Sequence, residues 1–95
     1  MVILIVRVES GLPEEEMLAV AKERAPRFRE LPGLIQKYYV KLGAPNQYGG
    51  IYIWDSMESL KAYRESELAA TIAKAYKAVR PPEVEVLEGL FPLRE

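Results

Sequence analysis

The chain has 95 residues, of which 49% are hydrophobic, 28% charged and 9% aromatic, values that suit a globular protein and not a disordered segment. Its 13 basic and 14 acidic residues are interspersed and leave a net charge of −1, so nucleic acid and anionic lipid are not expected partners. Histidine and cysteine are absent, which excludes disulfides, thiolate nucleophiles, Ser-His-Asp catalysis and histidine-ligated zinc, iron or haem.

The length predicts a single domain over residues 1–95, because a chain of this size has too few apolar residues for two cores. The longest apolar run, residues 1–6, is far shorter than the ~20 residues of a membrane span and lacks the flanks of a signal peptide. We therefore expect a cytoplasmic protein with no membrane partner. Asp55 is the only aspartate, so neither a metal nor another cofactor is predicted.

The first predicted elements are a strand over residues 2–9 and a helix that begins near Pro13. The strand has apolar residues on both faces until Arg7. Pro13 suits a first helical turn, and the three glutamates that follow it favour the positive end of the helix dipole. Pro26 is expected to disturb the helix near its end. The predicted buried stripe of this helix is Leu18, Ala21, Ala25 and Phe28.

A hairpin follows, with strands predicted over residues 34–42 and 49–54. The polar segment 43–48, which contains Pro45 and Asn46, predicts the turn between them. Gly49 and Gly50 indicate a bulge or a close backbone approach at the start of the second hairpin strand.

Two helical stretches and a last strand complete the chain. Asp55 and Glu58 match a capping box and predict a helix start. A second helical stretch is predicted from residue 68 to 79, before the break at Pro81 and Pro82. The last strand covers residues 83–87, with Phe91 as the furthest residue that it could reach.

The order βαββααβ predicts an α+β, ferredoxin-like fold, in which a four-stranded antiparallel sheet carries its helices on one face. The other sheet face would then expose a larger apolar patch than a monomer tolerates. We therefore expect a homodimer that pairs through the sheet faces, as a dimeric α+β barrel.

Three segments carry a resemblance to a known family: residues 32–37, residues 49–52 and residues 59–63. They resemble the dimeric α+β barrel superfamily, in particular the YdhR-like proteins described as monooxygenases and the wider antibiotic biosynthesis monooxygenase family. The resemblance implies that a flat aromatic substrate binds between helices and sheet, and that a quinol-like compound is oxygenated without metal or flavin. Some relatives have histidine where this chain has Tyr63, so histidine-based proton transfer is not available here.

Four residues are predicted to bind substrate. Tyr52 and Trp54 share a strand face, and Tyr38 or Tyr39 could lie opposite them, which would form an aromatic slot for a planar ligand. Cross-strand aromatic residues are also ordinary core or interface packing. Asn46 could reach over the mouth of a pocket, although asparagine beside proline is equally normal in a turn.

Three residues are candidates for catalysis. Arg7 could pair with a substrate anion or form a salt bridge with Glu9, Glu85 or Glu88. Lys37 could act as a base only if burial lowered its pKa by several units, and its position also suits an exposed strand face. Tyr63 lies on an apolar helical stripe and is otherwise a core residue.

Two functions remain open at this point, and with them whether the chain is an enzyme. The first is a cofactor-independent monooxygenase that acts on an aromatic or quinol-like small molecule. The alternative is a non-catalytic dimer of the same fold that binds a small molecule or responds to stress. The lack of histidine favours the alternative, because histidine is the residue best suited to acid-base chemistry near neutral pH.

Overall fold

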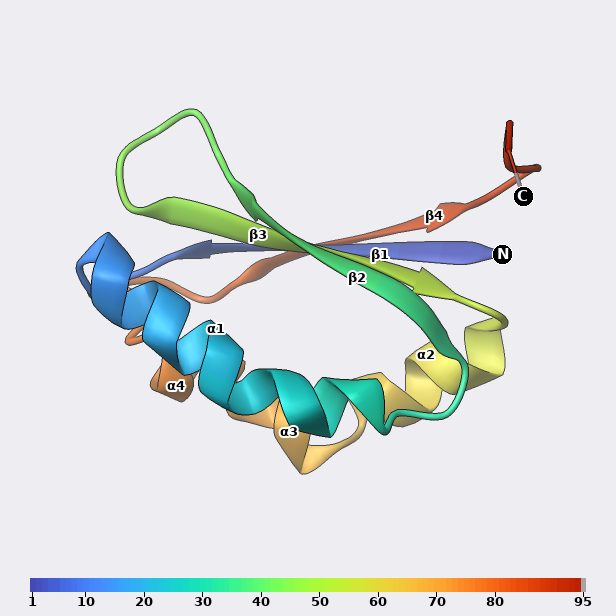
Figure 1. The fold of residues 1–95 in the computed structure, drawn as a ribbon, viewed down its shortest axis with the longest axis horizontal. Helices are drawn as coiled ribbons and strands as arrows, with labels where there is room; N and C mark the ends of the chain where they lie inside the picture. The colour runs from blue at the N-terminus through green and yellow to red at the C-terminus, as the bar shows by residue number, and fades with distance from the viewer. Residues whose placement is uncertain (95) are drawn as a thin grey trace.

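The computed structural model describes residues 1–94, which form one four-stranded antiparallel sheet with strand order β2-β3-β1-β4. The helices all lie on one side of this sheet (Figure 1). The predicted ferredoxin-like α+β fold is confirmed. The elements are β1 (Val2–Glu9), α1 (Glu14–Arg29), β2 (Leu34–Lys41), β3 (Gln47–Trp54), α2 (Met57–Arg64), α3 (Glu67–Ala70), α4 (Ile72–Ala75) and β4 (Glu83–Glu88).

The central strand β1 separates two different surfaces. Its even-numbered residues, Val2, Leu4, Val6 and Val8, are buried under the helices. Its odd-numbered residues, beginning with Ile3 and Ile5, are only half-buried and point to the opposite face. We call that second surface, which no helix of residues 1–94 covers, the open face.

Helix α1 runs through Pro26 to Arg29 without a break, so the expected disturbance at the proline does not occur. A single missing N–H near the end of a 16-residue helix leaves the hydrogen bonds on either side in place. The buried residues are Met17, Ala21 and Phe28, whereas Leu18 is 41% exposed. The predicted stripe was therefore wrong at Leu18, because steps of four and seven residues place Met17 in line with Ala21 and Phe28.

Strand β2 contains a β-bulge that determines which of its side chains face the helices. The ladder with β3 pairs Leu34 with Trp54 but Gln36 with Ile53, so Ile35 is an extra residue and is 62% exposed. One added residue moves every later side chain to the other face of the sheet. Lys37 is consequently opposite Tyr52, on the helix side.

The hairpin itself is close to the prediction. β2 ends at Lys41 and β3 begins at Gln47, and Asn46 in the turn has a positive φ of 62°. The β2–β3 ladder continues without a register shift through Gly49 and Gly50. The two glycines therefore mark a close approach and not a bulge.

The second helical region differs from the prediction at both of its starts and at its end. The N-cap of α2 is Ser56, whose Oγ accepts a hydrogen bond from the Ser59 N–H at 3.2 Å, so the capping box at Asp55 was wrong by one residue. The helix predicted over residues 68–79 is instead two single turns, α3 and α4. The Thr71 hydroxyl donates to the carbonyl of Glu67 at 2.9 Å, and such a side-chain bond competes with a continuous helix.

Residues 78 and 79 do not continue a helix and are instead hydrogen-bonded to the chain at the end of β1. Ala78 forms a β-bridge with Ser10, and the N–H of Val79 donates to the carbonyl of Glu9. Strand β4 then ends at Glu88, one residue beyond the prediction, and Phe91 lies outside it with 77% of its surface exposed.

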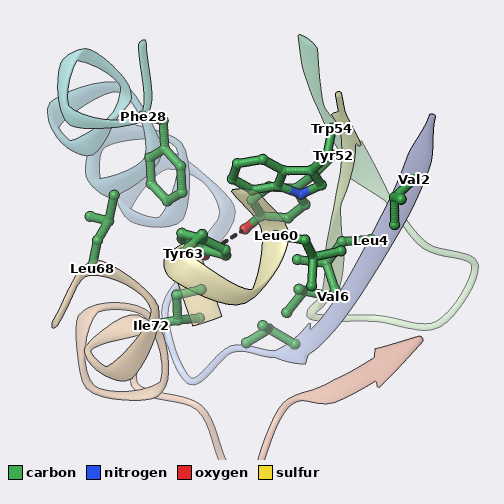
Figure 2. Packing of buried hydrophobic residues seen from close by; sticks show 11 residues of the cluster. Val2, Leu4, Val6, Phe28, Tyr52, Trp54, Leu60, Tyr63, Leu68 and Ile72 are labelled. Carbon is green, nitrogen blue, oxygen red and sulfur yellow. Dashed lines mark hydrogen bonds between the residues drawn. The ribbon is translucent and has the colours of Figure 1, made fainter. Parts of the chain in front are cut away.

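The main core lies between the sheet and the helices (Figure 2). Trp54, Tyr52 and Tyr63 are the largest aromatic side chains in it and are 0%, 2% and 3% exposed. Among residues 1–94, no helix is long and apolar enough to cross a membrane.

Candidate functional site

A cleft opens between the sheet and the helix layer, on the side of the sheet that α1 and α4 cover. β1 contributes Val6 and Val8 to the wall, and Ile72 of α4 closes one side. The polar or aromatic side chains that line it are Ser10, Phe28, Lys37, Tyr39, Tyr48, Tyr52 and Tyr76. An apolar cleft with few polar groups is typical of a binding site for a small aromatic molecule.

Lys37 is the charged residue in the wall of this cleft, and its amine is enclosed by aromatic rings. Nζ lies 3.4 Å from the ring centre of Phe28, 4.4 Å from that of Tyr39 and 4.5 Å from that of Tyr52. Among the described residues, no acidic side chain forms an ion pair with Lys37. We call these three rings the aromatic cage of Lys37.

Two opposing effects determine the protonation of this amine. The faces of the three rings favour the ammonium form. Burial removes water from the charged form, and the positive charge of Arg24 adds to that effect, which together lower the pKa of Lys37 from 10.5 to about 7. Burial and Arg24 therefore make this amine lose its proton more readily than an exposed lysine does.

Gly50 provides the room that Lys37 and Tyr52 occupy. A Cβ atom at this position would lie 2.8 Å from a ring carbon of Tyr52 and 3.2 Å from Cε of Lys37. The first distance is shorter than any normal contact, so a larger residue would displace the Tyr52 ring. The predicted close backbone approach at Gly50 thus serves the two side chains beside it.

Tyr52 and Tyr63 form a buried hydroxyl pair behind the cage. Their oxygen atoms are 3.2 Å apart, and Figure 2 shows the contact as a dashed line between β3 and α2. Burial raises the pKa of Tyr63 to about 12 and raises that of Tyr52 further. Both hydroxyls are therefore neutral near pH 7, and neither is suited to remove a proton from a substrate.

Trp54 extends the same aromatic layer away from the cleft. Its ring stacks on Tyr52 at a centroid distance of 6.3 Å and on Tyr63 at 5.4 Å. Its Nε1 is buried, and within residues 1–94 it has no hydrogen-bond acceptor. Trp54 supports the position of Tyr52 and does not line the cleft around Lys37.

Arg24 on α1 places a second positive charge near the cleft. Its guanidinium donates to the carbonyl of Leu68 at 2.8 Å and to the Thr71 hydroxyl at 3.3 Å, which ties α1 to α3 and to the residue that follows it. Its charge acts on both Lys37 and Tyr39. An anion formed in the cleft would be stabilised by this charge.

Besides Trp54 and Tyr63, which pack behind the cleft without lining it, three predicted site residues lie away from it. Arg7 is on the open face and pairs with Glu85 at 3.2 Å, one of the salt bridges expected for it. Tyr38 is also on the open face, opposite Ile51, and is 55% exposed. Asn46 is an exposed turn residue whose carbonyl accepts the N–H of Ser10 at 2.8 Å.

The predicted slot is thus partly corrected. Tyr38 cannot form a wall with Tyr52 and Trp54, because the sheet separates them, and Tyr39 is the tyrosine on their side. Phe28 and Arg24 were not predicted as site residues. Their spacing of four residues on one helix face was the available signal, since it places both over the same part of the sheet.

Within residues 1–94, no group of three acidic side chains is arranged to hold a metal ion. The groups that the cleft offers are one amine, the hydroxyls of Ser10 and of the tyrosines, and aromatic ring faces. These groups can accept a proton and can hold a planar ring.

Comparison with known proteins gives one family and several similar folds. The sequence family described as "Putative mono-oxygenase ydhR" matches residues 3–93. No curated protein matches the chain.

Solved structures of low sequence identity share the fold. SnoaB from Streptomyces nogalater, a cofactor-independent oxygenase, has 19% identity and a TM-score of 0.77 over 99% of this chain and 97% of its own. Rv0793 from Mycobacterium tuberculosis has 18% identity and a TM-score of 0.75 over 97% of each chain. NE2512 from Nitrosomonas europaea, of unknown function, has 23% identity and a TM-score of 0.74 over 96% of this chain and 90% of its own. The family resemblance seen in the sequence is confirmed, and the protein belongs to the YdhR family of mono-oxygenase-like proteins.

Proposed function

We propose that the protein is a monooxygenase that uses O2 to oxidise an electron-rich phenol or quinol-like compound, without metal or flavin. The observation that carries this proposal is the Lys37 amine, enclosed by three aromatic rings in the wall of an apolar cleft. Its lowered pKa gives it the basicity that a general base needs near neutral pH. Membership of the YdhR family and the fold shared with SnoaB support the same reaction type.

The reaction begins with proton transfer. Neutral Nζ of Lys37 takes the phenolic proton, and the charge of Arg24 favours the resulting phenolate. The phenolate gives one electron to O2, and the two radicals combine at the ring carbon para to the oxygen. Lys37 returns its proton to the peroxide that forms. The C–H bond at this carbon and the O–O bond then break, and water leaves. A second carbonyl group remains on the ring, so that phenol and O2 give quinone and water overall.

The test of this function is O2 consumption. Purified protein is incubated aerobically with a panel of 1-naphthols and other phenols that carry hydrogen at the para carbon, and O2 uptake is followed together with substrate absorbance. We expect consumption above the protein-free rate for at least one compound, with one water formed for each O2. Because only neutral Lys37 accepts a proton, kcat/KM should rise as the pH rises through about 7 and then level off. Binding seen by Trp54 fluorescence, with no O2 uptake over the whole panel, would support the non-catalytic alternative instead.

We further propose that two copies pair through their open faces. This face carries half-buried isoleucines at positions 3, 5, 51 and 53, and Tyr38 and Leu87 are 55% and 41% exposed beside them. A continuous apolar surface of this kind is rare on a monomer. A two-fold axis would place the apolar patch of one copy against the same patch of the other copy. The Arg7–Glu85 pair would lie at the end of each patch.

Ile51→Lys tests the paired state. Ile51 lies between Ile5 and Tyr38 in the ladder, at the centre of the open face. We expect the wild-type protein to elute at twice the chain mass and the variant at the chain mass, with self-association at least about 100-fold weaker. Leu18→Lys on the outer surface of α1 is the matched control and should remain paired. A wild-type monomer at micromolar concentration would contradict the proposal.

A further inference from the structure

Lys37 lines two hollows of the molecule. It lines the cleft described above, and it also lines a second hollow that Ala25, Arg29, Leu34 and Gln36 border. The lysine side chain therefore lies between two spaces. With no ion-pair partner among residues 1–94, the nitrogen lone pair is not engaged by a carboxylate when the amine is neutral.

The other lysines have different surroundings. Lys22, Lys41, Lys61, Lys74 and Lys77 are all exposed. Lys41 illustrates the contrast, because its hydrogen bond to Glu14 at 2.8 Å raises its pKa and keeps it charged. An amine is nucleophilic only in its uncharged form. Of the six lysines, Lys37 is therefore the one whose surroundings favour a nucleophilic amine.

We propose that Lys37 is a covalent binding residue for planar aromatic aldehydes, which it holds as an imine in the cleft. The aromatic cage provides ring faces against which the aldehyde ring packs, and Arg24 favours an aldehyde that carries a phenolic or carboxylate group over one that carries a cation. This activity goes beyond the proposed oxygenation. It uses the same side chain but requires no O2.

The bond changes are those of ordinary imine formation. The Nζ lone pair forms a bond to the carbonyl carbon while the carbonyl oxygen takes a proton, which gives a carbinolamine. The hydroxyl of that intermediate then leaves as water, and a C=N bond replaces it. The apolar wall of the cleft slows the return of water to the imine. Neither oxidant nor reductant is needed.

The experiment traps the imine by reduction. The full chain is incubated at pH 7 under nitrogen with 4-hydroxybenzaldehyde and sodium cyanoborohydride, and the products are measured by intact mass and by peptide mapping. We expect one adduct per chain, with the mass of the aldehyde less its oxygen, located at Lys37. The rate at Lys37 should exceed that at exposed Lys61 by at least about tenfold, since an amine at its ordinary pKa is almost wholly charged at pH 7.

Three controls decide the outcome. Lys37→Met should remove this adduct, Lys61→Met should retain it, and pentanal should label Lys37 at least about tenfold more slowly than the aromatic aldehyde does. Labelling of all lysines at equal rates, or an adduct count unchanged in Lys37→Met, would overturn the proposal. Because the reaction is run without O2, a protein that fails to oxidise phenols can still form the adduct, and the two proposals fail separately.

Discussion

Lys37→Met is expected to lower kcat/KM for aerobic phenol oxidation by about 10²- to 10⁴-fold, the range that a general base contributes. Methionine keeps an unbranched side chain of similar length in the aromatic cage, so the cleft retains its shape while it loses its proton acceptor. The remaining activity should lose the rise with pH through about 7. Lys61→Met, on the exposed side of α2, should have wild-type kinetics.

The same variant should fold at least as well as the wild-type protein. The folded-state pKa of Lys37, about 7, lies below its unfolded value of 10.5, so unfolding takes up a proton between these pH values. Stability therefore increases with pH from about 7 to 10.5, and at neutral pH the native state bears the cost of removing this amine from water. Methionine bears no such cost. In urea unfolding at pH 7.5, the midpoint for Lys37→Met should equal or exceed that of the wild-type protein. A lower midpoint would indicate that the variant loses activity because its packing is damaged.

Trp54→Ala is expected to lower the free energy of unfolding by about 3–5 kcal/mol, the usual range for removing a fully buried tryptophan. Trp54 is 0% exposed, stacks on Tyr52 and Tyr63, and lies opposite both Val2 and Leu34 in the sheet. Total stabilities of small domains are about 5–15 kcal/mol, so this loss is a large part of the whole. Urea titration followed by far-UV circular dichroism measures it.

Two controls separate ring packing from the polar Nε1. Trp54→Phe keeps an aromatic ring and removes a buried N–H that has no acceptor within residues 1–94, so it should cost less than half as much as the alanine variant. Leu18→Ala removes an apolar side chain that is 41% exposed, and it should change stability by less than about 1 kcal/mol. If Trp54→Ala costs no more than Leu18→Ala, the aromatic layer is not the centre of the core.

The fold could be predicted from the sequence because its signals are local. Alternation in residues 2–9 and in the hairpin follows the two-residue period of a strand, and the observed β1 has the predicted limits. The structure of the region after residue 66 was harder to predict from the sequence. Leucine, alanine and isoleucine at helical spacing favour a continuous helix, but the bridge between Ala78 and Ser10 is a contact across the fold that a local pattern does not contain.

The candidate site could be predicted only in part, and the reason lies in one strand. Alternation showed that Tyr38 and Tyr39 point to opposite faces, but it could not show which face is the helix side. Tyr52 and Trp54 share a strand face as predicted. For Lys37 the alternation left two positions open, a buried one that would suit a base and an exposed strand face, and the structure has the buried one. Whether Lys37 is buried depends on the extra residue at Ile35, and strand patterns do not reveal a bulge without knowledge of the partner strand.

The bulge at Ile35 determines which functional group of β2 enters the cleft. If the strand ran without the bulge and Ile35 paired with Ile53, Lys37 would lie opposite Ile51 on the open face, and Tyr38 would lie opposite Gly50 on the helix side. The cleft would then receive a phenol in place of an amine, with every amino acid of the chain unchanged. The register of β2, and not only its residue types, therefore determines which groups the cleft can offer.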